Sequence, residues 1–148
     1  MTHLHSMLRT PNSDRMWYLG DAFRSGMTIE QIHELTYIDP WFLHNIRQII
    51  EMEQTLIAAK PLLDKSAGDE LSDLLRQAKQ YGFSDKRLAT LWSTNEKDVR
   101  ALRKERGVRP VYKRVDTCGA EFEAFTPYLY STYEEECEAA PSDRKKII

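Results

Sequence analysis

A chain of 148 residues and 17.3 kDa fits one domain and is long enough to bury a core. Its mean hydropathy of -0.58 and the lack of a long uncharged apolar run exclude a membrane-spanning helix, and residues 1–7 lack the apolar centre of a signal peptide. The formal net charge of -2 argues against indiscriminate nucleic-acid binding, and the two cysteines, Cys118 and Cys137, favour free thiols in a cytoplasmic protein over a disulfide.

The first part of the chain has the start and stop signals of two short helices. Asn12 is placed to cap a helix that runs to about Arg24, and Gly26 then supplies the left-handed stop. Thr28 begins the next helix, with Gln31 at the spacing of a capping box.

Asp39 followed by Pro40 is the clearest helix start in the chain. The carboxylate can accept orphan amide bonds, and a proline at the first helical position sacrifices no needed donor. The helix predicted from Pro40 to about Ala59 is about 30 Å long at ~1.5 Å per residue, so we expect it to be the spine of the domain. Its broad apolar face is formed by Trp41, Phe42, Ile46, Ile49, Ile50, Leu56 and Ile57.

Three further helices are predicted before residue 108. Apolar residues recur at helical spacing over residues 71–81, and Ser84 is placed to cap a short helix. Ser93 and Glu96 have the spacing of a second capping box, which predicts a last helix ending near Gly107.

The segment from Val111 to Ala140 has no sustained helical period and is rich in aromatic residues. We predict an extended tail with one short strand near residues 110–115, whose rings drape over a surface built elsewhere. Those rings belong to Tyr112, Phe122, Phe125, Tyr128, Tyr130 and Tyr133.

Charge is unevenly distributed around this boundary. Residues 97–114 carry eight basic and two acidic side chains, whereas residues 116–138 carry seven acidic and no basic ones. The two segments could pair with each other, meet separate partners, or simply be solvated.

One functional candidate follows from the helical pattern alone. The stretch from Ser84 to Gly107 has two short helices joined by a polar turn, with Arg100, Arg103 and Lys104 expected on the exposed side of the second. This is typical of a helix-turn-helix DNA-binding domain, in which the second helix enters the major groove. Exposed cations on a helix are more commonly only solvated, so this interpretation is kept as the alternative.

Several separated sequence blocks occur in a fixed order along the chain. They are Asp14-Arg15, Ala22-Phe23-Arg24-Ser25-Gly26, Leu35 to Leu43, Tyr81-Gly82-Phe83-Ser84-Asp85, Leu102-Arg103, Pro110 to Cys118 and Tyr130 to Glu135. In that order they resemble the middle, oligomerization domain of the carbamoyl-phosphate synthase large chain, from about Leu8 onward. The end, from Arg144 to Ile148, is similar to the start of the strand that in this family leads into a glycine-rich loop of the second synthetase half.

The resemblance implies a parent enzyme that makes carbamoyl phosphate from bicarbonate, ammonia and two ATP, for pyrimidine and arginine biosynthesis. Its partners would be the flanking ATP-grasp halves of the same chain and a small glutaminase subunit that supplies ammonia from glutamine. ATP and Mg2+ or Mn2+ would be cofactors of the parent. No stretch of this chain matches the nucleotide-binding loops or metal-binding carboxylates of those halves, so no catalytic, cofactor-binding or metal residue is carried over.

The other chemically suggestive residues have simpler interpretations. His3 and His5 lack further metal ligands, and Cys118 has no base placed near it by sequence, so we expect a small buried residue there. The run Glu134-Glu135-Glu136 is expected to be solvated acid. Trp17, Trp41 and Trp92 are spaced as core residues.

The sequence therefore predicts an all-α fold of short helices around one long helix, followed by an extended aromatic-rich tail. We divide it into residues 1–7, a native or tag-derived extension; residues 8–107, the helical core; and residues 108–148, a tail leading toward an ATP-binding domain beyond it. The expected role is to connect and oligomerize without catalysis, in a cytoplasmic homo-oligomer that contacts neither nucleic acid nor membrane.

Overall fold

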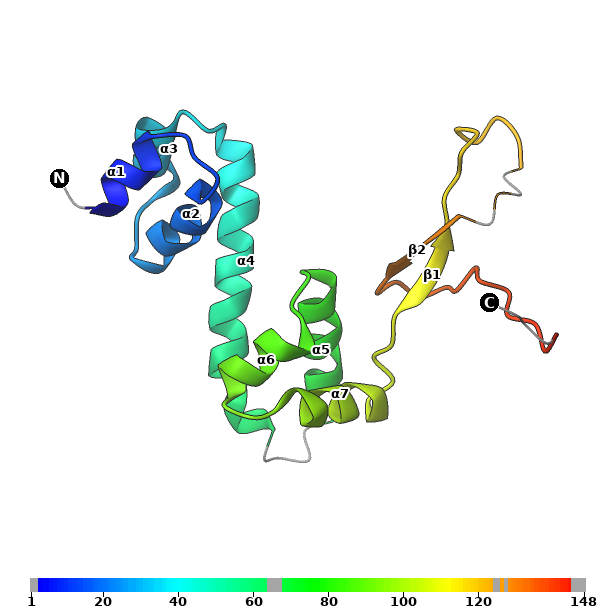
Figure 1. The fold of residues 1–148 in the computed structure, drawn as a ribbon. Helices are drawn as coiled ribbons and strands as arrows, with labels where there is room; N and C mark the ends of the chain where they lie inside the picture. The colour runs from blue at the N-terminus through cyan, green and yellow to red at the C-terminus, as the bar shows by residue number, and fades with distance from the viewer. Residues whose placement is uncertain (1–2, 64–67, 124–125, 127, 145–148) are drawn as a thin grey trace. The chain divides into compact units, whose positions relative to one another are not determined.

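A computed structural model describes residues 3–63, 68–123, 126 and 128–144 (Figure 1). Over these residues the chain has seven α-helices, one short 3-10 helix and two strands, which confirms the predicted mostly helical fold. The chain forms two compact units, which meet at Lys60 and Pro61 and which we call the N-terminal and C-terminal units.

Four helices build the N-terminal unit. They are α1 (His3–Arg9), α2 (Arg15–Arg24), α3 (Ile29–Thr36) and α4 (Pro40–Ala58). Helix α1 packs against α2 and α3, and both α2 and α3 pack on α4 (Figure 1). With 19 residues, α4 is the longest helix in the described part of the chain, as the sequence predicts.

Two of the predicted helix caps are confirmed and one is wrong. Thr28 and Gln31 form a reciprocal capping box, with bonds of 3.3 and 2.9 Å. The Asp39 carboxylate accepts the first-turn amide of α4 at 2.8 Å. Asn12 is not the cap of α2: its side-chain oxygen accepts the amide of Asp14 at 2.9 Å, and Asp14 takes the capping position. The chain makes an extra turn there before the helix begins.

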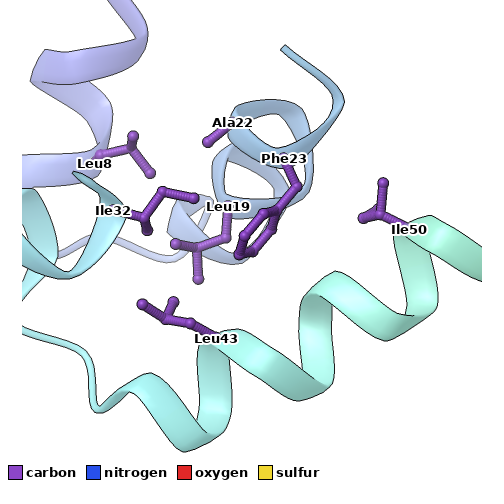
Figure 2. Close-up of a cluster of buried hydrophobic side chains, with 7 residues drawn as sticks. All are labelled: Leu8, Leu19, Ala22, Phe23, Ile32, Leu43 and Ile50. Atoms are coloured by element: carbon purple, nitrogen blue, oxygen red, sulfur yellow. The ribbon is translucent and has the colours of Figure 1, made fainter. Parts of the chain in front are cut away.

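The core of the N-terminal unit is mainly aliphatic. Figure 2 shows side chains from all four helices pointing toward one another, and each fully buried leucine among them stabilises the fold by about 1.5–3 kcal/mol relative to an exposed one. The helix α1 contributes to this core, so residues 3–7 begin a helix that takes part in packing. The cluster comprises Leu8, Leu19, Ala22, Phe23, Ile32, Leu43 and Ile50.

The C-terminal unit begins with the 3-10 turn η1 (Lys60–Leu62), whose first residue belongs to the N-terminal unit. It continues with α5 (Asp69–Gln80), α6 (Asp85–Trp92) and α7 (Glu96–Glu105). Helices α6 and α7 pack closely together. Their buried residues include Leu88, Trp92 and Val99.

The boundary between α6 and α7 differs from the prediction. Ser84 caps α6 as expected, accepting an amide at 3.0 Å. Ser93, however, closes α6 in a left-handed conformation with φ of 55°, so it cannot also begin the next helix. Asn95 caps α7 instead, and its side-chain oxygen accepts the amide of Asp98 at 2.9 Å.

The tail contains an antiparallel β-hairpin. Strand β1 (Val111–Arg114) confirms the predicted strand, whereas β2 (Leu129–Thr132) was not predicted. The register pairs Lys113 with Tyr130. Gln80, at the end of α5, donates to the carbonyl of Tyr133 at 3.0 Å, which ties this hairpin to the helices of its own unit.

Two predictions lie outside the described residues: the position of Phe125, and the strand expected to start within residues 145–148. Among the helices that are described, none combines the length and apolar character needed to cross a membrane.

Candidate self-association surface

The most unusual surface of the N-terminal unit is made of large apolar side chains. Trp17, Tyr37 and Trp41 are 75%, 86% and 66% exposed, and Met16 and Phe42 are also more than half exposed. We call these five residues the N-terminal apolar surface. Single exposed apolar residues are common on proteins, but five such large side chains on a unit of this size are unusual and make these residues candidates for a binding surface.

Three of these residues lie at helix ends that a hydrogen bond joins. The guanidinium of Arg15, the first residue of α2, donates to the carbonyl oxygen of Thr36, the last residue of α3, at 2.7 Å. Met16 and Trp17 follow Arg15 in the first turn of α2, and Tyr37 follows Thr36 directly. The bond therefore brings the first turn of α2 close to the end of α3.

The first turn of α4 supplies two more rings. Trp41 and Phe42 meet edge to face, with ring centroids 4.9 Å apart and planes at 88°. This is a favourable geometry for two aromatic rings. Because Asp39 caps the Trp41 amide, the pair sits on a fixed helix end rather than on a loop.

Tyr37 is held in an unfavourable backbone conformation. Its φ of 57° lies in the left-handed region, where glycine or asparagine usually ends a helix. A non-glycine residue in such a conformation costs about 1–3 kcal/mol and persists where the surroundings or the function require it. Its amide donates to the carbonyl of His33 at 2.7 Å, and its side chain is almost fully exposed. The fold gains no buried contact from this ring, which favours a role outside the fold.

Two further exposed residues, Asn45 and Ile49, follow Phe42 along α4. Phe42, Asn45 and Ile49 are separated by three and four residues, the spacing of a coiled-coil seam. Asn45 donates to the carbonyl of Trp41 at 2.7 Å. A polar residue within such a seam fixes the register of a pairing helix.

The sequence prediction that all three tryptophans belong to a core is wrong for two of them. Only Trp92 is buried, at 2% exposure. Trp17 and Trp41 lie outside because the aliphatic cluster already fills the space between the four helices. Helical spacing identifies an apolar face, but it does not say whether the chain itself covers that face.

The helix-turn-helix alternative loses its main cation. Arg103 is buried, and its Nε lies 2.9 Å from both carboxylate oxygens of Asp85. Arg100 pairs with Glu96 and lies 3.5 Å from Asp85. Of the three predicted DNA-contacting cations, two are therefore engaged in ion pairs within the unit, and a DNA-binding role is not supported.

Asp85 is the centre of a buried ionic network. Lys79 also donates to it at 3.0 Å, and the side chains of both residues are less than 10% exposed. Burial by itself raises the pKa of the Asp85 carboxyl, but the hydrogen bonds from Lys79 and Arg103 outweigh it and hold the pKa below its usual value of 3.8. Arg103 further donates to the carbonyl of Val108 at 3.2 Å, so the network links three helices to the segment that leads into β1.

The acidic run of the tail gathers around a lysine. Lys113 in β1 lies 4.0, 3.8 and 3.4 Å from carboxylate oxygens of Glu134, Glu136 and Glu138. The basic and acidic segments therefore pair internally at this point, one of the possibilities left open by the sequence. The run is exposed, as predicted.

The two cysteines and the N-terminal histidines His3 and His5 belong to no metal site among the described residues. Cys118 is half-buried in a turn rather than buried as expected, and Cys137 is exposed. Backbone hydrogen bonds at Ala139 and Tyr112 hold the pKa of the Cys137 thiol below its usual value. In the described part of the chain, no three His, Cys, Asp or Glu residues are arranged to hold a metal ion.

Comparison with known proteins gives a consistent family. The family described as "Carbamoyl-phosphate synthetase large chain, oligomerisation domain" matches residues 1–107. Proteins named carbamoyl phosphate synthase large chain are 52% identical in Synechocystis sp., 53% in Myxococcus xanthus and 46% in Archaeoglobus fulgidus. These similarities cover 100%, 98% and 100% of this chain but only 13%, 13% and 14% of the relatives.

Proposed function

Because the chain belongs to the family of the carbamoyl-phosphate synthetase large-chain oligomerisation domain, we propose that its N-terminal apolar surface binds the same surface of a second copy. The observation that carries this proposal is the exposure of Trp17, Tyr37 and Trp41 on a unit whose own core is already closed. Tryptophan and tyrosine are the residues that most commonly dominate the binding energy of protein interfaces.

The proposed contact is symmetric. Two copies of α4 cross in antiparallel orientation near Asn45, with Phe42 and Ile49 of each copy on either side of the crossing. In a two-fold interface the same patch serves both subunits, so one apolar stripe with a central polar residue is sufficient. Each Asn45 amide nitrogen already donates one hydrogen to the Trp41 carbonyl, and its second hydrogen and its side-chain oxygen can pair with those of the other Asn45 only when the helices cross at this position.

A cysteine placed at the crossing tests this geometry directly. In a background with Cys118→Ser and Cys137→Ser, Asn45→Cys is expected to form an intermolecular disulfide under mild oxidation, because disulfides need Cα atoms within about 7 Å. Glu51→Cys is the matched control, since Glu51 is exposed on a different face of α4. Equal cross-linking of the two variants, or none of Asn45→Cys, would reject the proposed crossing.

For the complete protein we propose the synthesis of carbamoyl phosphate from bicarbonate, glutamine-derived ammonia and two ATP in the cytoplasm. This rests on the relatives' names and on family resemblance, since the chain spans about 13% of their length. ATP, Mg2+ or Mn2+, and the small glutaminase subunit would then be bound by parts of the protein other than residues 1–148. No catalytic, cofactor or metal residue is assigned to this chain.

Within the chain we propose that two regions with different roles meet near residue 107. Residues 8–107 would hold neighbouring catalytic halves in a fixed relation and associate with a second copy, whereas residues 108–148 would lead toward the next domain. Support for this comes from the family match, which ends at residue 107, four residues before β1 begins. Isothermal titration calorimetry of residues 1–148 with MgATP is expected to give no specific binding. Specific binding would contradict this division.

A further inference from the structure

The two edges of the small sheet are not equivalent. The amide of Val115 donates to the carbonyl of Tyr128 at 2.8 Å, which continues the register that pairs Arg114 with Leu129. Hydrogen-bonded pairs alternate along an antiparallel ladder, so Tyr112 and Arg114 direct their backbone polar groups away from β2. By the same alternation Leu129 and Ser131 direct theirs away from β1.

The outer edge of β1 is occupied by the chain itself. The amide of Glu138 donates to the carbonyl of Tyr112 at 2.7 Å, and the Glu138 carboxylate accepts the amide of Arg114 at 2.7 Å. Glu138 thus supplies both a donor and an acceptor to this edge. These bonds also help to hold the pKa of the Glu138 carboxyl below its usual value.

The outer edge of β2 has no such cover. Among the described residues, β2 pairs only with β1, and nothing bonds to the outward amides and carbonyls of Leu129 and Ser131. Large apolar side chains flank this edge: Tyr128, Leu129 and Tyr130 are 62%, 38% and 48% exposed. An open strand edge beside exposed rings is a template for a further strand.

A hairpin of two four-residue strands is at best marginally stable in water and gains stability from a third strand. We propose that the open edge of β2 pairs with an extended segment from a neighbouring part of the same, longer polypeptide. The oligomerisation-domain match ends at residue 107, before the hairpin. The Synechocystis relative is nevertheless similar over the whole of this chain, so it contains a corresponding hairpin region, which follows its oligomerisation domain. About 87% of that relative's length lies outside the aligned region, since the chain covers 13% of it.

A neighbouring segment of one polypeptide is favoured over a second copy because it is present at a high effective concentration. The charge beside the edge also defines its chemistry. Glu134 and Glu136 follow β2 and share one lysine, Lys113, whereas Glu138 lies at the outer edge of β1, so the end of β2 carries net negative charge. The segment is therefore apolar where it faces Leu129 and carries Lys or Arg at the end beside Glu134.

Hydrogen exchange tests the proposal without any substitution. The amides of Leu129 and Ser131 are expected to exchange rapidly in the 148-residue chain and about 100-fold more slowly in the complete large chain. Rapid exchange of both amides in the complete chain would overturn the proposal. Slow, concentration-dependent exchange in the 148-residue chain would assign the edge to a second copy and would equally overturn it.

A proline at the edge provides a second, independent measurement. Ser131→Pro removes only an outward amide, since proline is tolerated at such edge positions, whereas Ser131→Ala retains the amide and is the control. In the complete chain, Ser131→Pro is expected to restore rapid exchange at Leu129 and Ser131→Ala is not. The N-terminal apolar surface is unchanged in both variants, so failure here leaves the proposed self-association standing, and the reverse also holds.

Discussion

The N-terminal apolar surface and the Asp85 network depart from the usual distribution of side chains in opposite directions. One places Trp17, Tyr37 and Trp41 in water, and the other buries a carboxylate with a lysine and an arginine. Every charge in the buried network has a partner within the same unit. Among the described residues of the N-terminal unit, by contrast, none buries the rings of Trp17, Tyr37 and Trp41. From this contrast we expect the network to stabilise the fold and the rings to bind a second copy.

Removal of the Asp85 carboxylate should have the largest effect on folding. Asp85→Ala leaves Lys79 and Arg103 buried without a counter-ion, which is expected to cost about 3–5 kcal/mol in the free energy of unfolding. Urea denaturation followed by circular dichroism measures this. Asp73→Ala, at an exposed position in α5, is the control. A loss below about 1 kcal/mol for Asp85→Ala would mean that the network is dispensable for folding.

A matched pair of substitutions on α4 separates folding from binding. Leu43→Ala removes a fully buried core side chain and should cost about 2–5 kcal/mol. Trp41→Ala, two residues earlier but exposed, should change stability by no more than about 1 kcal/mol while weakening self-association. Denaturation and light scattering on both variants measure the two effects. Comparable destabilisation by the two substitutions would show that Trp41 supports the fold.

Substitution of Tyr37 should change stability and self-association in opposite directions. Tyr37→Gly relieves left-handed strain of about 1–3 kcal/mol, and the larger entropy loss of glycine on folding offsets about 1 kcal/mol of this, so stability should rise by up to about 2 kcal/mol. The same change removes an exposed ring and should reduce self-association. Tyr37→Phe keeps the ring and the strain and is the control. A clear loss of stability in Tyr37→Gly would show that the ring contributes packing.

The smallest expected effect is a dependence of stability on pH. Because the pKa of Asp85 is lowered in the folded state, the network contributes its full stabilisation above pH about 4 and loses it as the pH falls further. Denaturation midpoints measured from pH 6 to pH 3 should therefore decline less in Asp85→Asn than in the parent chain. Identical declines in the two proteins would show that Asp85 does not contribute to the loss of stability at low pH.

The sequence predicted the features that depend on near neighbours. The capping box at Thr28, the Asp39-Pro40 start of α4 and the Ser84 cap depend on residues within one turn, and all three are present. Ser93 was misassigned because its spacing to Glu96 is equally compatible with a helix that ends there. Local patterns specify that a boundary exists more reliably than which residue closes it.

Features that depend on distant parts of the chain were less predictable. Nothing in the spacing of Trp41 shows that Leu43 and its neighbours fill the core without it. The strand β2 was missed although it contains Tyr130 and Thr132, which favour strands, because its partner strand is distant in the sequence: Tyr130 pairs with Lys113, 17 residues earlier. The burial of Arg103 likewise depends on Asp85 in another helix.

Sedimentation equilibrium of the 148-residue chain at high micromolar concentration tests the central claim most directly. The account predicts reversible association of the parent chain, its loss in the double variant Trp41→Ala with Phe42→Ala, and its persistence in Ile57→Ala, which removes an exposed residue elsewhere on α4. A parent chain that remains monomeric at these concentrations, or a double variant that associates as strongly as the parent, would contradict it.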